Sequence, residues 1–365
     1  MRGRSVLIAS LQLHKNSGSA RTVFEQIKYF KENNYKVFVA SLTLNKRAVA
    51  ELGVTPYRLL PWVKRTGLKR RNWFNFQVSI LKWMIRPDVI IGHGDILEQD
   101  ILTLHNSVFL ANELIYKQKL SKDNEMAIIH GNILNSGKFQ FVIANSRMMK
   151  EDLIKRFGIS SDKIEVIYPM LDSNVFYRKS DEERAEFRRK FNLPNKIVVA
   201  LVTSGNFKKR GLDRFIDAIK SLPDHIREMA DFRVVGKDRV STDYHYLTFD
   251  GEMEDIQNYY NAIDIFVLPA YIEEFGRVVI EAMGCGLPVI TTSTVGASEI
   301  LVDEGRRFIL SPFTTDSFSS ALKDLILSKE LREDIGRVNS RAVSFSLEQQ
   351  RSKLNVILNK MENIY

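Results

Sequence analysis

The residues whose types and spacing could do chemistry lie close together between positions 264 and 292. Glu273 and Glu274 follow a short apolar run, and Glu281 comes eight residues after Glu273. An ionised carboxylate can only accept hydrogen bonds, so hydroxyl groups of a ligand would satisfy these acids. Glu281 stands in otherwise apolar sequence, where a charge is costly unless it has partners. These acids are therefore candidate ligand-binding residues.

The pattern around the acids predicts a βαβ unit. Residues 265–268 and 289–292 are apolar runs typical of buried parallel strands, and residues 276–283 have the pattern of a helix. Such units bind ligands beyond the carboxyl ends of the strands, near the N-terminus of the helix. We therefore expect Glu273 at the mouth of a site. The backbone N–H groups available to an anion would be those of Phe275, Gly276 and Arg277.

Glu281 has two interpretations that the residues leave open. Gly284 and Cys285 follow one turn later and leave room for a ligand, such as a ribose whose two hydroxyls would donate to the carboxylate. The alternative is an ion pair with Arg277, four residues earlier on the helix. Cys285 itself fits a small packing residue better than a nucleophile.

A second concentration of charge follows the apolar run 196–202. A loop from Thr203 to Gly211 contains Gly205 and ends in three adjacent cations: Lys208, Lys209 and Arg210. An amphipathic helix follows from Leu212. A strand, a glycine-containing loop with cations and then a helix can bind a diphosphate. Solvated loop charges are the alternative, and three cations in a row do not exclude it.

Composition limits the class of protein. A chain of 365 residues with 44% apolar residues predicts a globular protein of two domains. One cysteine fits a reducing cytoplasm and excludes an intrachain disulfide framework. No apolar run reaches the roughly 18 residues of a membrane span. The first residues resemble a short signal peptide but lack a small-residue cleavage site, so a first strand is the better reading.

The N-terminal half begins as a further Rossmann-type unit. Residues 5–11 and 35–42 predict strands and residues 22–33 a helix, with Gly18 in the loop between, where it would let the backbone approach a ligand. Two more predicted strands end at His93 and at His105. A histidine just beyond a parallel strand points toward the ligand site. A lone histidine is more often structural, so the residues alone single out neither.

Several of these segments together resemble one family. Glu273 and Glu281, with Phe275-Gly276 near the first and EAM-x-x-G-x-P at the second, resemble the signature of GT-B, family-4-like retaining glycosyltransferases. The segment SGNFKKRGLDRFIDAIKSLP closely resembles the phosphate loop of lipopolysaccharide-core glucosyltransferases within this family. The resemblance implies an α/β fold of two Rossmann-like domains facing across a cleft.

The resemblance also implies roles for single residues. Glu273 would lie by the transferred sugar, Glu281 would bind the nucleotide ribose, and Lys209 with Arg210 would contact the pyrophosphate. His105, in the motif TLHN, would contact the sugar near the reacting carbon, with His93 in reserve. The loop 295–301 would close over the donor. The chain departs from the family in four places: Glu274 stands where glycine is common, Asn206 where arginine is common, Gly18 where two glycines are usual, and Gly296 where a pair of glycines is usual.

The predicted domains follow from these segments. Residues 1–172 would form the N-terminal, acceptor-side domain, 173–194 a linker and 195–345 the nucleotide-sugar domain. Residues 346–365 would form a last helix that returns toward the N-terminal domain and begins with a capping box of Ser346 and Gln349.

The segment 61–87 mixes basic residues with large aromatic ones, in a region where residues 1–90 carry 17 basic against 4 acidic residues. This suits an anionic membrane surface or nucleic acid. The plainer alternative is a helix with a solvated charged face and an apolar core face. We favour the membrane over nucleic acid because the other strong features concern a nucleotide sugar and no nucleic-acid-binding motif is present.

The predicted function is retaining transfer of a hexose from a UDP- or GDP-sugar to a lipopolysaccharide-type or other glycan or lipid-linked acceptor. The enzyme would be cytoplasmic, peripheral on the inner face of the cytoplasmic membrane. No Asp-x-Asp motif occurs, so we expect no cofactor and no essential metal. The alternatives are a GT-B epimerase and a non-catalytic sugar-nucleotide-binding protein. A phosphorylase would need a pyridoxal-binding lysine motif, which is absent.

Overall fold

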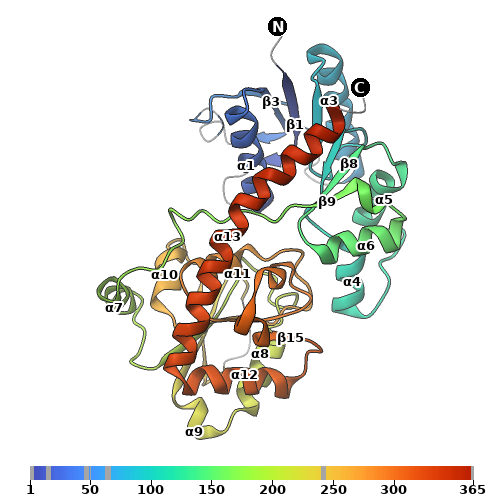
Figure 1. Ribbon diagram of the computed structural model, residues 1–365. Coiled ribbons are helices and arrows are strands. Elements are labelled where there is room, and N and C mark those ends of the chain that lie inside the picture. The colour runs from blue at the N-terminus through green and yellow to red at the C-terminus, as the bar shows by residue number, and fades with distance from the viewer. Residues whose placement is uncertain are drawn as a thin grey trace. The chain divides into compact units, whose positions relative to one another are not determined.

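The computed structural model describes residues 4–13, 18–44, 49, 51–61, 67–239 and 244–362, with the side chains of 345–351 and 362 left aside. Contacts divide the chain into two compact units, each built on its own parallel sheet (Figure 1). Unit 1 consists of residues 1–170 and 350–365, and unit 2 of residues 171–349. Within the described part, no helix combines the length and the apolar character needed to cross a membrane.

The sheet of unit 1 has seven strands, all paired in parallel. In sheet order they are β5 (Thr55–Arg58), β3 (Lys36–Ser41), β1 (Ser5–Ala9), β6 (Val89–Gly92), β7 (Ile101–Thr103), β8 (Phe141–Ala144) and β9 (Ile164–Val166). A separate pair is formed by β2 (Gln12–Leu13) and β4 (Thr43–Leu44). The helices are α1 (Gly18–Glu32), α3 (Leu68–Ile85), α4 (Val108–Tyr116), α5 (Glu125–Ser136) and α6 (Arg147–Phe157), with the short turn η1 (Ser161–Lys163).

The apolar side chains of the unit 1 strands point alternately to the two faces of the sheet and form a separate hydrophobic core on each face. In β1, Val6 and Ile8 pack in the cluster that contains α1, whereas Leu7 and Ala9 pack in the cluster that contains α3. Successive side chains of a strand point to opposite faces, so both faces of this sheet are covered. Parallel sheets covered on both faces have continuously apolar strands, which is the pattern seen in the sequence.

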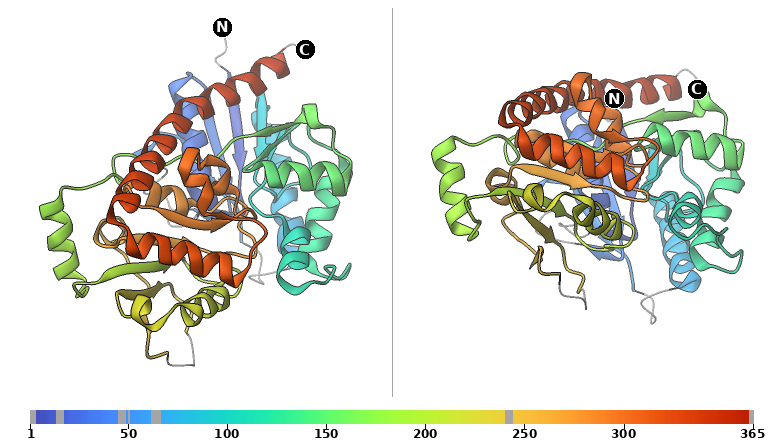
Figure 2. Two further views of the ribbon diagram at one scale, coloured as in Figure 1. Left: turned by 60° about the horizontal axis from the view of Figure 1, so that its bottom comes forward. Right: turned by 90° about the horizontal axis from the view of Figure 1, so that it is seen from below.

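Unit 2 has a six-stranded sheet that is also paired in parallel throughout. In sheet order its strands are β12 (Leu247–Gly251), β11 (Ala230–Val235), β10 (Ile197–Val202), β13 (Ile265–Leu268), β14 (Val289–Thr292) and β15 (Ile309–Leu310). The helices are α7 (Asp181–Lys190), α8 (Leu212–Ser221), α9 (Asp224–Arg227), α10 (Ile256–Ala262), α11 (Arg277–Gly284) and α12 (Thr315–Leu327), with the turns η2 (Gly296–Ile300) and η3 (Asp303–Phe308). Figures 1 and 2 show α8 and α12 side by side, where Phe215 stacks on Phe318 with ring centroids 6.1 Å apart.

Each sheet reverses its direction of growth once. In unit 1 the chain builds β1, β3 and β5 outward on one side and then returns to β6 on the other side of β1; in unit 2 the same reversal occurs between β10 and β13. In open parallel sheets, ligands bind beyond the carboxyl ends of the strands at such a reversal. The loops after β1, β6, β10 and β13 are therefore where a site is expected.

The predicted βαβ unit is confirmed, with β13 and β14 at the predicted bounds and α11 displaced by one residue. The predicted position of Gly18 is wrong, because Gly18 is the first residue of α1 rather than part of a loop. Residues 14–17, which precede it, lie outside the described residues.

The last helix does not begin at Ser346. α13 (Lys329–Glu362) passes through this position as one uninterrupted helix, and the boundary between the two units falls inside it (Figures 1 and 2). No glycine or proline occurs between residues 337 and 362. The backbone N–H groups at position 346 are already used by the helix before it, so a cap there has nothing to satisfy.

Candidate functional site

Two loops meet at the reversal point of the unit 2 sheet. One follows β10 and ends at Gly211, and the other follows β13 and starts at Pro269. Gly211 has φ 75°, and a Cβ at this position would lie 2.0 Å from the Pro269 carbonyl oxygen, so only glycine allows this approach. The N–H of Tyr271 also donates to the carbonyl of Lys209 at 3.0 Å. The loop with the cations is therefore fastened to the loop with the acids.

Asn206, one of the departures from the family pattern, has a structural role in the first loop. It adopts φ 60°, a region that asparagine tolerates better than arginine. Its side-chain oxygen accepts from the N–H of Lys209 at 3.1 Å. Asp238 fixes the same loop from β11's carboxyl end by accepting from the N–H of Phe207 at 2.9 Å. Asn206 therefore orients the Lys209 backbone without adding a charge.

The loop with the acids is held by the chain after β14. The N–H of Glu273 donates to the carbonyl of Thr294 at 3.0 Å, and the carbonyl of Glu273 accepts from the N–H of Gly296 at 2.9 Å. The N–H of Ala297 donates to the carbonyl of Phe275 at 2.6 Å. Gly276 then begins α11 with φ 93°. The segment expected to close over a donor is thus bonded to the loop that carries Glu273.

Cations and acids pair across the two loops. The Nζ of Lys209 lies 2.6 Å from an Oε of Glu274, and the guanidinium of Arg210 pairs with the carboxylate of Glu273. All four side chains are at most 17% exposed. Burial lowers the pKa of the Arg210 guanidinium, and the nearby Glu274 carboxylate opposes that shift. Two positive and two negative side chains are therefore largely buried together at the reversal point of the sheet.

The three adjacent cations do not act alike. Lys208 turns away from the acids: its Nζ pairs with Asp213 at 2.5 Å and lies over the ring of Tyr271. Arg214, which the sequence did not single out, donates to the carbonyls of Pro269 and Ala270 and lies 3.7 Å from the centre of the Tyr271 ring. Its position on the first turn of α8, close after the cation cluster, is the signal that could have drawn attention to it.

Glu281 is buried on α11, as expected, with 6% of its surface exposed. The space expected beside it for a ligand is filled on the side of Gly284. A Cβ on Gly284 would lie 2.6 Å from a methyl group of Leu171 and 2.8 Å from the carbonyl oxygen of Phe176. Gly284 therefore serves close packing of the chain that enters unit 2. Burial raises the pKa of the neighbouring Cys285 thiol to about 12, which fits a packing residue and not a nucleophile.

In unit 1 the two candidate histidines lie in contact rather than being alternatives. His93 follows β6 and His105 follows β7, and their Nδ1 and Nε2 atoms are 2.8 Å apart. His93 Nε2 lies 3.0 Å from the side-chain oxygen of Gln26 on α1, whose amide nitrogen donates to Thr103 at 3.1 Å. Gln26 was not predicted from the sequence to be a site residue. It could have been recognised in the sequence as a polar residue on the otherwise apolar face of α1, three residues after Val23 and four before Phe30.

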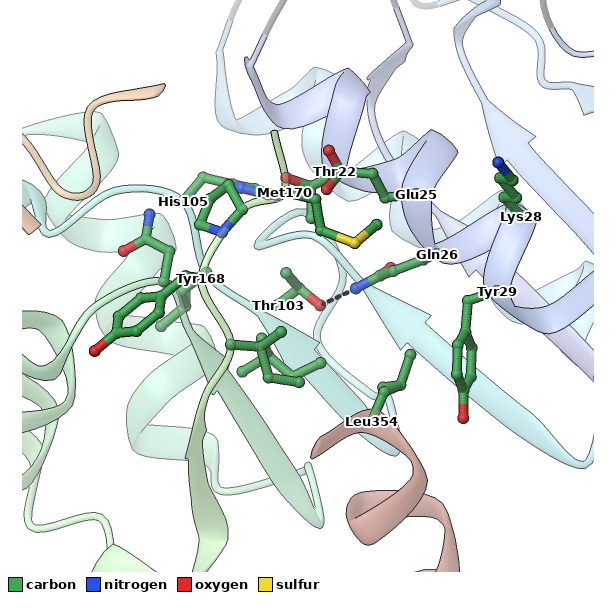
Figure 3. Close-up of a pocket in the computed structure, with 15 residues that line it drawn as sticks. Thr22, Glu25, Gln26, Lys28, Tyr29, Thr103, His105, Tyr168, Met170 and Leu354 are labelled. Carbon is green, nitrogen blue, oxygen red and sulfur yellow. Dashed lines mark hydrogen bonds between the residues drawn. The ribbon is translucent and has the colours of Figure 1, made fainter. Parts of the chain in front are cut away.

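A cavity of about 70 Å³ lies beside His105 within unit 1. Figure 3 shows Gln26 and Thr103 reaching it from α1 and β7, with His105 on another side. Most of its wall is apolar, and its lining residues include Thr22, Glu25, Tyr29, Asn145, Tyr168, Met170 and Leu354. Gly18 begins the helix that supplies five of the lining residues. His93 is not among the lining residues, so it contacts His105 from behind.

The predicted site residues thus fall into two groups. Lys209, Arg210, Glu273 and Gly276 come together in unit 2, with Gly205 in the same loop as the cations and Phe275, Arg277 and Glu281 in or next to α11. Gly18 and His105 belong to unit 1. Among the residues that the structure describes, no group of three or more His, Cys, Asp or Glu could hold a metal ion.

Two family profiles match the chain. The profile described as "Glycosyltransferase Family 4" matches residues 16–175, and the one described as "Glycosyl transferases group 1" matches residues 183–341. The chain is 26% identical over 195 residues to the lipopolysaccharide glucosyltransferase WaaG of Escherichia coli K12. This sequence match covers 50% of the chain and 51% of WaaG, so the aligned segment spans about half of each protein.

Solved structures are similar in fold over nearly the whole chain. A crystal structure of WaaG, a glycosyltransferase involved in lipopolysaccharide biosynthesis, matches with a TM-score of 0.74 at 17% identity, covering 95% of this chain and 97% of that one. The structure of Alr3699/HepE from Anabaena in complex with UDP and glucose matches with a TM-score of 0.70 at 18% identity, covering 99% of each chain. Both likenesses concern the fold, which is GT-B.

Proposed function

Because this chain belongs to the family 4 glycosyltransferases, a retaining family, we propose that it transfers a hexose from a UDP- or GDP-sugar to a glycan or lipid-linked acceptor of lipopolysaccharide type. Unit 2 binds the donor and unit 1 the acceptor. The observation that carries this proposal is the pairing of Lys209 with Glu274 and of Arg210 with Glu273 at the reversal point of the unit 2 sheet.

The chemistry of the donor accounts for this set of residues. Transfer breaks the bond between the anomeric carbon and the diphosphate, which leaves with growing negative charge. Lys209, Arg210 and the N-terminus of α11 after Gly276 supply positive charge and N–H donors for that leaving group. They serve in place of the metal that an Asp-x-Asp motif would hold. Glu273 holds hydroxyls of the transferred sugar, Glu281 those of the ribose, and His105 the sugar from unit 1.

The paired charges also predict how the donor binds. In a ligand-free site, each cation is neutralised by a buried acid, which avoids the cost of an isolated buried charge. A diphosphate that takes over the cations releases Glu273 to accept from sugar hydroxyls. An intact nucleotide sugar satisfies both sets of groups, whereas a free nucleotide satisfies only the cations.

A donor screen tests this function directly. We expect UDP- or GDP-sugars at about 100 times their Kd to stabilise the protein by roughly 2.7 kcal/mol, which raises the unfolding midpoint by several degrees. Product analysis with the stabilising donor then separates the alternatives. A glycosylated acceptor supports the proposal, an epimerised donor without acceptor favours the epimerase, and donor that binds but stays intact with every acceptor favours a non-catalytic binding protein.

The second part of the proposal concerns α3. Four large apolar side chains are exposed along one side of this helix at spacings of four, seven and eight residues: Phe76 (55%), Ile80 (43%), Trp83 (74%) and Met84 (64%). Its other side packs into the core through Phe74, Val78 and Leu81. The exposed cations Lys82 and Arg86 flank the apolar residues. The basic residues Lys64 and Arg65 lie outside the described residues.

We propose that this apolar and basic side of α3 lies on an anionic membrane, which would make the enzyme peripheral on the cytoplasmic face. A purely solvated, charged face would not expose four large apolar residues. Aromatic and aliphatic side chains between lysines and arginines match the boundary between lipid head groups and acyl chains. A lipid-linked acceptor would be presented at that same surface.

Binding to vesicles measures this contribution. We expect the double substitution Phe76→Ala and Trp83→Ala to weaken binding to vesicles of mixed phosphatidylglycerol and phosphatidylcholine by about a hundredfold or more, since each of the two rings loses roughly 1.5 kcal/mol or more of burial. Tyr116→Ala, which removes a 60% exposed ring from α4, is the matched control and should bind as the native protein does. Equal binding by all three proteins, or binding to nucleic acid in a filter assay, would count against the membrane.

A further inference from the structure

The cavity of unit 1 has the size and the wall of a site for a small apolar group. Its volume is about 70 Å³. An engineered apolar cavity of about 150 Å³ binds benzene, so half that volume has room for about three or four carbon atoms. Figure 3 shows Leu354 pointing into the cavity from α13. The apolar part of the wall includes Leu104, Ile143, Ile167, Pro169, Met170 and Leu354.

The buried polar groups in the wall are satisfied by the protein itself. Gln26 Nε2 donates to Thr103 Oγ1 at 3.1 Å, and Gln26 Oε1 lies 3.0 Å from His93 Nε2. Among the described residues that line the cavity, no buried side-chain nitrogen or oxygen lacks a hydrogen-bond partner. A water molecule needs roughly two to four polar partners to be held in a cavity. This cavity therefore offers water few hydrogen bonds and favours an apolar occupant.

Hydrogen bonds between the surrounding elements keep the cavity open. The hydroxyl of Tyr29 on α1 donates to Asn355 on α13. The Nζ of Lys353 donates to the carbonyl of Val166 at 2.7 Å, which ties α13 to β9, and Gln26 ties α1 to β7. These bonds fix the elements around the cavity within unit 1 without filling it. A preformed cavity spares its ligand the cost of ordering the wall.

We propose that this cavity binds a short aliphatic group of the acceptor substrate, about three or four carbon atoms long. The assignment to the acceptor rests on the proposed function, in which unit 1 binds the acceptor, whereas the apolar site itself does not. His105, which the family resemblance puts at the sugar, lines the same cavity. The acceptor class that fits is a sugar with a short alkyl or acyl chain near its reacting hydroxyl. An unsubstituted glycan would leave the cavity empty.

Saturation-transfer NMR with isobutanol tests the cavity without any sugar transfer. We expect the native protein to transfer signal to isobutanol and not to glycerol, a polar molecule of similar size. Leu354→Trp places a bulky side chain in the cavity and should remove most of that signal. Val356→Trp is the matched control, because Val356 lies on the same helix, is 42% exposed and does not line the cavity. Ile167→Phe fills the cavity from another wall, in case Leu354→Trp does not fold. Undiminished signal from a folded filling variant would overturn the inference.

Sugar transfer to paired glycosides tests the assignment to the acceptor. For each sugar that accepts, we expect kcat/KM to be at least about tenfold higher for the isobutyl than for the methyl glycoside, since each buried carbon atom contributes about fourfold. Val356→Trp should keep this ratio, and Leu354→Trp should lower it to about one. A ratio of about one in the native protein would overturn the assignment, even if isobutanol binds. If isobutanol binds as expected but no acceptor is glycosylated, the proposed function fails with the assignment, and the apolar site stands.

Discussion

Replacing Arg210 by alanine should lower kcat/KM for sugar transfer by about 10²-fold, mainly through kcat. The guanidinium lies in the loop after β10, fastened to the loop that carries Glu273. Charge on a departing diphosphate grows toward the transition state, so a fixed cation stabilises that state more than the bound donor. Loss of one such preorganised group costs on the order of 10²- to 10³-fold in related electrostatic sites. Steady-state rates with saturating acceptor would measure this.

Unfolding must be separated from lost catalysis, because Arg210→Ala leaves the carboxylate of Glu273 without its cation. An uncompensated buried charge costs about 3–5 kcal/mol, and the 15% exposure of Glu273 puts the expected loss at the lower end. The double substitution Arg210→Ala with Glu273→Gln removes both charges. It should recover much of the lost thermal stability while transfer stays as slow as in the single variant or slower.

Lys208→Ala is the matched control for position and charge. Lys208 lies two residues before Arg210, but its ammonium is half-exposed and pairs with Asp213. Removing it should change kcat/KM by less than about twofold, since an exposed ion pair contributes little. If Lys208→Ala slowed transfer as much as Arg210→Ala, net positive charge rather than position would be responsible, and the assignment of the leaving-group site would be wrong.

The fold could be predicted because its signals are local. Continuous apolar runs such as 265–268 and 289–292 specify buried parallel strands, and the helix between them follows from periodicity and its flanking glycines. Helix α6 also begins at a local signal, an N-cap in which Ser146 accepts from the N–H of Met149 at 3.2 Å. The family resemblance added the GT-B arrangement, which apolar patterning alone would not specify.

The pairings inside the candidate sites could not be predicted, because each joins side chains that are remote in sequence. Lys209 and Glu274 are 65 residues apart and Gln26 and His93 are 67 apart. Which atoms meet depends on strand register and on loop paths that no local pattern encodes. The same holds for Gly284, whose open face was expected to receive a ligand but is filled by Leu171 and Phe176.

Glu281 provides the sharpest test of how the donor is held. If its carboxylate accepts from the two ribose hydroxyls, Glu281→Gln should weaken binding of the nucleotide sugar by roughly tenfold to a hundredfold. The reason is that hydrogen bonds to a charged acceptor contribute about 1.5–3 kcal/mol each, and the amide is a weaker, single acceptor. Isothermal titration with the donor found in the screen would measure the change in Kd.

The alternative, in which Glu281 only pairs with Arg277, predicts a different pattern. Arg277→Gln would then weaken binding as much as Glu281→Gln, and the hydroxyls of the ligand would be irrelevant. A 2′,3′-dideoxy analogue of the nucleotide diphosphate separates the two cases. If Glu281 binds ribose, the native protein loses affinity for the analogue while Glu281→Gln loses little more, because the groups it would have contacted are gone. Inorganic pyrophosphate should bind both proteins equally, since it engages only the cations; if it does not, Glu281→Gln has disturbed the phosphate loop and its effect cannot be assigned to ribose.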